Sequence, residues 1–252
     1  MPPHEIRIMP VPISGEVLPG EDLAEKLAAS LKHQRLKLRN GDVLVVKHKI
    51  VSKTEGRTKS LADIKPSRTA RAWALRSGTD ARLVQLALSE STRIVRQKKG
   101  VLITQTRHGF VCANSGVDVS NVDGGATAVL LPKDSDRSAA RLRARLKKLC
   151  RIDVAVIISD TFGRPWREGL TEVAIGVSGM RPLIDYRGRH DPHGYRLHAS
   201  AEAAADELAC AAGLVCGKLN RTPICIIRGF KFQRGSGSAR ELIRPAKNDL
   251  FR

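Results

Sequence analysis

Short apolar runs alternate along the whole chain with polar segments in which apolar residues repeat at helical spacing. Runs rich in Val, Ile and Leu and bounded by turn residues are typical of buried strands. The strands we expect cover Ile6 to Val11, Val43 to Val46, Val101 to Thr106, Gly109 to Ala113, a stretch ending at Leu130 to Pro132, Val154 to Ser159, Thr171 to Val177 and Pro223 to Ile227. This pattern predicts a protein of strands and helices and is compatible with several arrangements of them.

Helix start and stop signals divide the remaining segments. The helices we expect cover Glu21 to Leu38, Pro66 to Lys98, Asp136 to Leu149 and Ala199 to Val215. In the second of these, Ser67 is a good N-cap, Ser77-Gly78 interrupts the helix, and Asp80 begins a second helix. The segment from His48 to Arg57 we expect to be a strand end followed by a polar turn.

The composition narrows the classes of partner. A chain of 252 residues forms one large domain or two small ones, and its net charge of +19 favours anionic partners: nucleic acid, membrane surfaces or phosphorylated and carboxylated small molecules. The cations recur throughout the chain, and its five Phe, two Trp and two Tyr supply few platforms for stacking bases. A basic nucleic-acid-binding protein is therefore an alternative that the charge alone supports.

Cysteines and histidines give no sign of a metal or disulfide framework. The five cysteines form no CxxC pair and are odd in number. His190, His193 and His198 match no familiar zinc spacing. The N-terminus lacks the apolar core of a signal peptide and no run reaches membrane-spanning length, so we expect a cytoplasmic protein.

The stretch from Val154 to Gly169 carries the clearest sign of chemistry. Its apolar strand is expected to stop at Ser159-Asp160-Thr161, which places Asp160 where a buried strand meets a loop, close to Arg164 and Arg167. A carboxylate beside guanidinium groups suits a divalent metal and the phosphates that it neutralises. The alternative is an ordinary turn aspartate that caps backbone N–H groups.

A second polar loop, Asn114 to Asn121, follows the predicted hairpin and contains Asp118 and Asn121. Two carboxylates at the ends of separate strands can share a metal if the fold brings them together.

Basic residues also surround the end of the second strand: Lys47, Lys49, Lys53 and Arg57. They are either phosphate contacts or a solvated edge, and both interpretations stay open. The charged segment Asp185 to Asp191 is a candidate substrate loop.

Several segments form an ordered set over nearly the whole chain. They are Gly41 to Val43, Val51 to Arg57, Gly116 to Val122, Ser159 to Arg167, Arg189 to Gly194, Ala205 to Glu207, Arg228 to Phe230 and Arg244 to Phe251. Each segment is weak alone, but the ordered set is specific. The chain resembles the coenzyme F420-0:gamma-glutamyl ligases, including the ligase domain of the bifunctional bacterial version. It contains neither a Walker A motif nor a GxGxxG motif.

The resemblance implies a fold and a reaction. The fold is α+β, with mixed β-sheets and flanking helices, and forms an intimate homodimer; residues 1–252 would be a single stand-alone ligase domain. GTP would activate a carboxylate of coenzyme F420-0 as an acyl phosphate, which the amine of L-glutamate attacks, and repetition would build a gamma-linked glutamate tail. Mg2+ or Mn2+ would neutralise the phosphates, with K+ as a further candidate. Neither nucleic acid nor membrane is expected as a partner.

The resemblance also assigns roles to residues. Asp118 and Asp160 would be catalytic and would bind metal, with Thr161 assisting at a second metal. Asn121 and Lys53 would contact GTP. The nucleotide would be lined by Ser14, Gly15, Glu16, Val17, His48, Lys49, Cys216, Gly217, Lys218, Leu219, Asn220, Arg221, Thr222 and Pro223.

Three positions depart from the family pattern. Ser14-Gly15 replaces a Leu-Pro-like pair, a Ser or Thr is usual near His48, and Lys218 occupies the place of an acidic metal ligand in the archaeal form. A protonated lysine cannot bind a cation, so a second metal would be held differently, or the ammonium would supply part of its charge. The bacterial bifunctional form also has Lys there, so this change does not indicate lost activity. A ligase of the same fold acting on another phosphorylated carboxylic acid is a further alternative.

Overall fold

The centre of the molecule is a six-stranded mixed β-sheet. The computed structural model describes residues 5–98, 100–119 and 125–249. The sheet order is β1 (Arg7–Val11), β12 (Ile224–Arg228), β2 (Val43–Lys47), β8 (Ala155–Arg164), β9 (Arg167–Met180) and β13 (Arg234–Gly235). β2 and β8 run parallel, whereas β1–β12, β12–β2, β8–β9 and β9–β13 are antiparallel neighbours.

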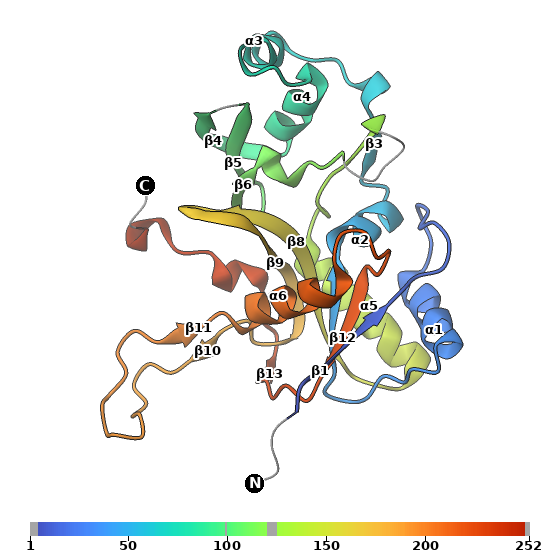
Figure 1. Cartoon of the computed structure of the whole chain (residues 1–252), viewed down its shortest axis with the longest axis vertical. Coiled ribbons are helices and arrows are strands. Elements are labelled where there is room, and N and C mark those ends of the chain that lie inside the picture. The colour runs from blue at the N-terminus through green and yellow to red at the C-terminus, as the bar shows by residue number, and fades with distance from the viewer. Residues whose placement is uncertain (1–4, 99, 120–124, 250–252) are drawn as a thin grey trace.

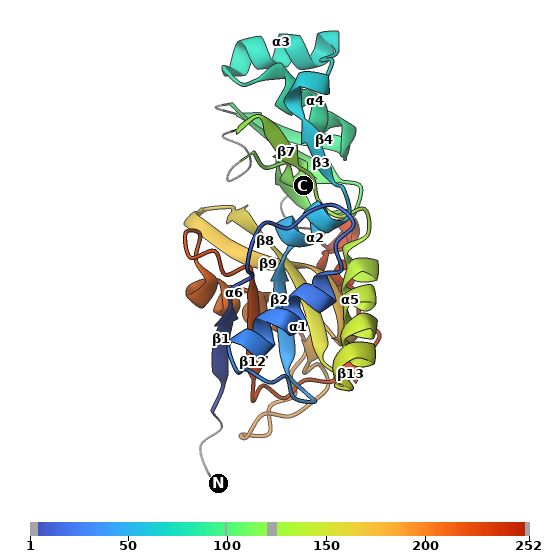
Figure 2. The ribbon, with the colours of Figure 1, turned by 90° about the vertical axis from the view of Figure 1, so that its right-hand side faces the viewer.

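Helices cover both faces of this sheet (Figure 1). α5 (Ser135–Cys150) packs on β8 and β9 and contacts α1 (Leu23–His33), whereas α6 (Ala204–Cys216) packs on β9, β12 and β1. Seen from the side, α1 and α5 lie across the sheet from α6 (Figure 2). Each helix contributes buried apolar side chains to the main core, among them Leu27, Leu146 and Leu208. Mixed sheets with flanking helices confirm the expected α+β class.

A second group of elements, residues 48–129, extends beyond the carboxyl end of β2 (Figure 1). It comprises α2 (His48–Thr54), β3 (Thr58–Ser60), η1 (Leu61–Asp63), α3 (Arg68–Ser77), α4 (Ala81–Ser89), β4 (Ser91–Lys98), β5 (Val101–Thr106), β6 (Val111–Ala113), η2 (Asn114–Gly116) and β7 (Thr127–Val129). Arg57 ties this group together: its Nε donates to Leu131 O at 2.9 Å and its Nη2 to the Glu90 carboxylate at 2.6 Å.

The segment between β9 and α6 forms an arm that extends from the sheet, with β10 (Ile184–Asp185) paired to β11 (Ala201–Glu202) at its base (Figure 1). The chain then ends in two short 3₁₀ helices, η4 (Ala239–Leu242) and η5 (Ala246–Asn248). Over residues 5–98, 100–119 and 125–249, no helix is long and apolar enough to cross a membrane.

The expected strands and most of the expected helices are confirmed, but three boundaries of expected helices were wrong because contacts elsewhere in the fold changed the backbone. Ser91–Lys98 was expected to be helical and forms β4, since its backbone pairs with the antiparallel strand β5. α1 ends at His33 rather than Leu38, and Arg35 takes a φ of 55° as the chain leaves the helix. α6 begins at Ala204 rather than Ala199, because Ala201–Glu202 pairs with β10.

Close packing of α5 against β9 depends on a glycine. A Cβ atom at Gly176 would overlap the backbone carbonyl of Ser135, the first residue of α5. We expect Gly176→Ala to lower the free energy of unfolding by about 1–3 kcal/mol, measured by urea denaturation. Gly163→Ala is the matched control in the adjacent strand, because its Cβ would meet Leu170 Cδ2 at an ordinary 3.8 Å. Equal stability of the two variants would contradict a tight contact at Gly176.

Candidate active site

The carboxyl ends of the two parallel strands form the candidate site. β2 ends at Lys47, which lies opposite Ser159 of β8, and α2 begins at the next residue, His48. β8 continues to Arg164 because its backbone pairs with β9 beyond the core. The expectation that this strand stops at Asp160 was therefore wrong, although complete burial does end there: Ser159 is buried and Asp160 is partly exposed. The expected strand end and polar turn after Lys47 is also wrong, since His48–Thr54 is helical.

Asp160 faces a buried histidine. His48 Nε2 lies 3.2 Å from Asp160 Oδ1, yet Nε2 has no well-aligned hydrogen bond to any described residue. His48 Nδ1 lies 3.3 Å from Ser52 Oγ in the same helix. Cys112 of β6 borders the same carboxylate: burial, and then the charge of Asp160, raise the pKa of its thiol to about 12. A buried imidazole nitrogen without an aligned partner is available to a ligand that enters beside Asp160.

Asp118 contacts the same helix, α2, through an ion pair with Lys49. Lys49 Nζ lies 2.7 Å from Asp118 Oδ2. The backbone of Asp118 is held by Val129, with N–H···O distances of 3.1 Å and 2.8 Å in the two directions. Consecutive residues of α2, His48 and Lys49, thus contact the two carboxylates that were predicted to bind metal. Asn121, predicted to contact GTP, lies outside the described residues.

The two aspartates supply the oxygen donors that Mg2+ and Mn2+ prefer. Within the described parts of the chain, no group of three or more His, Cys, Asp or Glu side chains is placed to hold a metal ion. A divalent ion bound by Asp118 or Asp160 would therefore complete its coordination with water or with oxygens of the substrates. The donor chemistry fits such an ion, because Mg2+ is commonly held by one or two carboxylates together with substrate phosphates.

Thr161 points away from Asp160. Its hydroxyl donates to Glu172 Oε1 at 2.8 Å, and alternation along β8 places neighbouring side chains on opposite faces. Glu172 of β9 also accepts a hydrogen bond from Ser159 Oγ at 2.9 Å and forms an ion pair with Lys47. Sequence reasoning missed Glu172, although a charged residue at the start of the apolar run Val173 to Val177 was a usable signal.

The basic residues around α2 are not a solvated edge. Lys47, Lys49 and Lys53 have side chains only 21%, 29% and 19% exposed, and each is paired with a carboxylate from a distant segment. The partner of Lys53 is Glu16, at 3.0 Å, in the first predicted nucleotide loop. An anionic ligand that reaches α2 would therefore meet ammonium groups already oriented by acidic partners.

The two predicted nucleotide loops lie at opposite ends of α2. Residues Ser14 to Val17 lie beside its carboxyl end through the contact of Glu16 with Lys53. The loop from Cys216 to Pro223 begins at the end of α6 and reaches the start of α2, where Lys47 N–H donates to Pro223 O at 2.9 Å. Gly217 to Arg221 are exposed, whereas Cys216 is buried and Thr222 donates to its carbonyl at 3.0 Å. Lys218 is thus held on an exposed loop with anchored ends.

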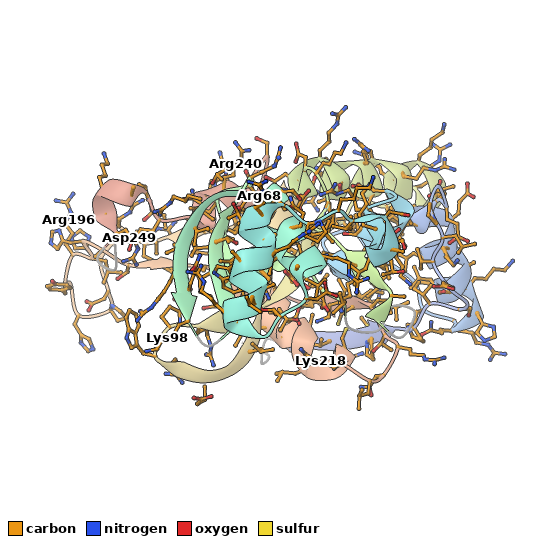
Figure 3. All side chains as sticks on the ribbon, turned by 90° about the horizontal axis from the view of Figure 1, so that it is seen from above. Arg68, Lys98, Arg196, Lys218, Arg240 and Asp249 are labelled. Atoms are coloured by element: carbon orange, nitrogen blue, oxygen red, sulfur yellow. The ribbon has the colours of Figure 1, made fainter. Side chains whose placement is uncertain are left out.

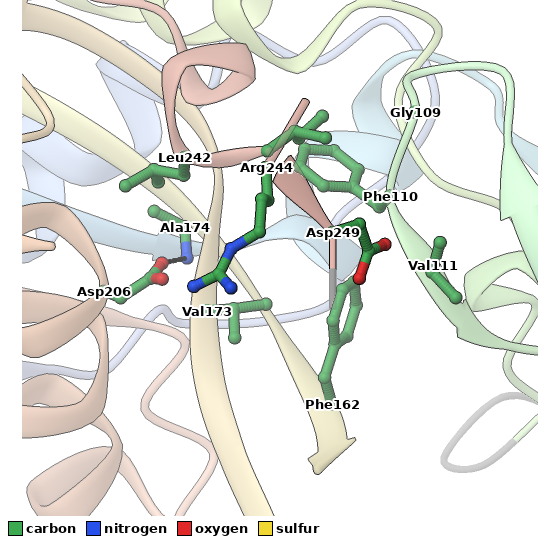
Figure 4. Close-up of a pocket in the computed structure, with 11 residues that line it drawn as sticks. Gly109, Phe110, Val111, Phe162, Val173, Ala174, Asp206, Leu242, Arg244 and Asp249 are labelled. Carbon is green, nitrogen blue, oxygen red and sulfur yellow. Dashed lines mark hydrogen bonds between the residues drawn. The ribbon is translucent and has the colours of Figure 1, made fainter. Parts of the chain in front are cut away.

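A hollow of about 270 Å³ lies next to this site (Figure 4). Phe110, Phe162 and Val173 form apolar walls, and the Arg244 side chain extends toward Asp206 and Val173. Phe162 is two residues from Asp160 on the same strand, so the two side chains share one face of β8. The charged groups of the lining include one guanidinium, Arg244, and two carboxylates, Asp206 and Asp249, so the hollow combines apolar walls with charges of both signs. Such a hollow suits a flat organic group that carries polar substituents.

The remaining charges are dispersed. Arg196, Lys98 and Lys218 lie at separate places around the outline of the molecule (Figure 3). His190, His193 and His198 belong to no metal-binding group within the described chain. All five cysteines are free thiols.

Comparison with known proteins identifies the family. The sequence profile of the F420-0:gamma-glutamyl ligases matches residues 13–229. A protein of Methanopyrus kandleri named coenzyme F420:L-glutamate ligase is 46% identical over 252 residues, 98% of each chain. Proteins of the same name from Methanothermobacter thermautotrophicus and Methanocaldococcus jannaschii are each 44% identical, over 92% and 85% of this chain and 93% and 86% of their own. The chain belongs to the F420-0:gamma-glutamyl ligase family.

Proposed function

We propose that this protein joins L-glutamate to coenzyme F420-0 through an amide bond, using GTP to activate the acceptor carboxylate. The observation that carries the proposal is the convergence of Asp160 and Asp118 on consecutive residues of α2. Relatives that match almost the whole chain are named coenzyme F420:L-glutamate ligases. Carboxylates and oriented cations at one sheet edge suit transfer of a phosphoryl group, which depends on positioning and charge neutralisation.

In this proposal the loops at Ser14 to Val17 and Cys216 to Pro223 hold the nucleotide along α2. The acceptor carboxylate attacks the γ-phosphorus of GTP, forming an acyl phosphate and releasing GDP. The amine of L-glutamate then attacks the acyl carbon, and inorganic phosphate leaves as the amide forms. Lys49 and Lys53 orient the phosphates, while Asp118 and Asp160 hold Mg2+ or Mn2+. Such an ion, when bound, would neutralise charge on the transferred group.

Two further features belong to the proposal. Lys218 would supply positive charge from its exposed loop at a position where an acidic residue holds a second metal in archaeal forms. Thr161 would assist that second metal only if its hydroxyl turned from Glu172. We also propose a homodimer, a cytoplasmic location, K+ as a candidate monovalent cofactor, and neither nucleic acid nor membrane as a partner.

Mass spectrometry of the coenzyme tests the function. After incubation of coenzyme F420-0 with GTP, Mn2+, L-glutamate and the protein, we expect the mass to rise by one or more glutamyl residues, because each cycle adds one amide-linked glutamate. No increase is expected with ATP or without metal. If GTP is hydrolysed while the coenzyme mass is unchanged, the acceptor is another phosphorylated carboxylic acid. If a folded protein changes neither GTP nor coenzyme, the proposal is wrong.

A further inference from the structure

Lys47 and Glu172 form an ion pair at the base of the candidate site. The family resemblance gave neither residue a role. Lys47 is the last residue of β2, and Glu172 lies on β9, separated from β2 in the sheet by β8. The two side chains are 21% and 8% exposed. Removing two charges from water is costly, and an apolar pair of similar size is often equally stable or more stable. Stability is therefore a weak explanation for charges at these two positions.

The surroundings of Glu172 hold it in one place. Its Oε2 accepts from Ser159 Oγ at 2.9 Å and its Oε1 from Thr161 Oγ1 at 2.8 Å, in addition to the ion pair with Lys47. α6 leaves room for this carboxylate by having no side chain at Gly213, where a Cβ would lie 2.7 Å from Glu172 Cγ. With an ammonium and two hydroxyl donors around it, the Glu172 carboxylate keeps two hydrogen bonds that hold it in position even when Lys47 has another partner.

Lys47 also adjoins both ends of the predicted nucleotide loop. Its N–H donates to Pro223 O at 2.9 Å at the end of the loop. At the start of the loop, contact with Cys225 lowers the pKa of the Cys216 thiol, and the charge of Lys47 lowers it further. Lys47 is thus bonded through its backbone to Pro223, the residue at which the loop rejoins the sheet. An ammonium has three N–H donors, so its ion pair with Glu172 does not exhaust them.

Resting on the nucleotide-dependent function proposed above, we infer that Lys47 contacts a phosphate of the bound nucleotide and that Glu172 is a positioning residue that orients Lys47. The partner of Lys47 differs from the partners of the other basic residues around α2. Lys49 and His48 face Asp118 and Asp160, which the metal would engage, and Lys53 faces Glu16, which is 66% exposed. The partner of Lys47 is a carboxylate that also accepts hydrogen bonds from two hydroxyl groups, those of Ser159 and Thr161. A cation fixed before the ligand arrives contributes more to binding than one that must be ordered.

Calorimetric titration of GTP with Mg2+ into the full chain tests the inference. Lys47→Met should weaken GTP binding by about 10- to 100-fold, the effect of losing one hydrogen bond to a charged group. Glu172→Gln keeps the size of the side chain and should weaken binding less, because the ammonium remains but is no longer oriented. Its effect should disappear when Lys47 is already Met, which a purely structural role of Glu172 would not produce.

The double variant Lys47→Met/Glu172→Gln separates binding from folding. It leaves no unpaired buried charge, so it should fold even if Lys47→Met alone does not. We expect it to bind GTP as weakly as Lys47→Met. The matched control is Arg143→Met/Asp153→Asn, which removes another partly buried ion pair, with side chains 32% and 21% exposed. This pair lies near the start of β8, at the end of the strand opposite to the candidate site. The control should leave GTP affinity unchanged.

The outcomes distinguish this inference from the function on which it rests. Wild-type GTP affinity in the folded double variant would overturn the role of Lys47 and leave the ligase proposal intact. A wild-type protein that binds neither GTP nor ATP would overturn nucleotide use and, with it, the role of Lys47. If GTP binding is weakened equally in the Lys47–Glu172 and Arg143–Asp153 double variants, the weakening is a general effect of lost charge. That result would also overturn the inferred role of Lys47.

Discussion

Asp160→Asn should lower the rate of glutamate addition by about 10²–10³-fold or more, the loss typical when a group that stabilises transition-state charge is removed. The substitution keeps the size of the side chain and removes the negative charge that faces His48 and that would hold a divalent ion. Asp160 is only partly buried and lies beyond the main core, so the protein should still fold. The measurement is turnover at saturating GTP, glutamate and Mn2+, together with the thermal unfolding temperature.

Asp153→Asn is the matched control for this substitution. Asp153 lies just before the opposite end of β8, is paired with Arg143 at 2.9 Å, and is similarly shielded, with 21% of its side chain exposed against 14% for Asp160. Its loss should reduce stability without reducing turnover. Near-normal turnover of folded Asp160→Asn would contradict a metal-binding or catalytic role. Asp118→Asn should resemble Asp160→Asn if the two carboxylates serve one ion.

Arg228→Met should cost about 3–5 kcal/mol of unfolding free energy, because it leaves a buried carboxylate without its counter-ion. Arg228 Nε and Nη2 donate to the two oxygens of Asp42 at 2.8 Å and 2.7 Å. Asp42 is 1% exposed and also accepts the Arg39 N–H at 2.8 Å. The pair joins the start of β2 to the end of β12, two central strands that are far apart in the sequence. Urea denaturation at neutral pH measures the loss.

A surface ion pair of the same type provides the comparison. Arg187 also donates through Nε and Nη2 to both oxygens of one carboxylate, that of Asp185, but the side chains are 61% and 48% exposed. Arg187→Met should leave the unfolding midpoint unchanged, since water replaces the lost contacts. If Arg228→Met has an equally small effect, Asp42 is solvated or neutral in the variant, and its burial does not depend on Arg228.

The buried strands were accessible from the apolar runs, because a buried strand needs a continuous supply of Val, Ile and Leu. Helix starts at Asp22, Ser67 and Asp80 were equally accessible, since a side-chain cap is a local interaction. The strand Ser91–Lys98 was not accessible from the sequence, because this exposed segment takes its strand conformation from its partner β5. Local patterns thus determine a conformation only where the local sequence supplies most of its stabilisation.

By itself the sequence determined the family, through an ordered set of motifs, and placed Asp118 and Asp160 in loops or strand ends that follow apolar strands. Only the tertiary structure decided that β2 and β8 are parallel neighbours, so that α2 meets both aspartates. It also decided that Thr161 faces Glu172 rather than Asp160, and that Lys47 is held by Glu172. The physical reason is that alternation tells which side chains share a face of one strand, whereas the choice of neighbouring strand depends on packing across the whole sheet.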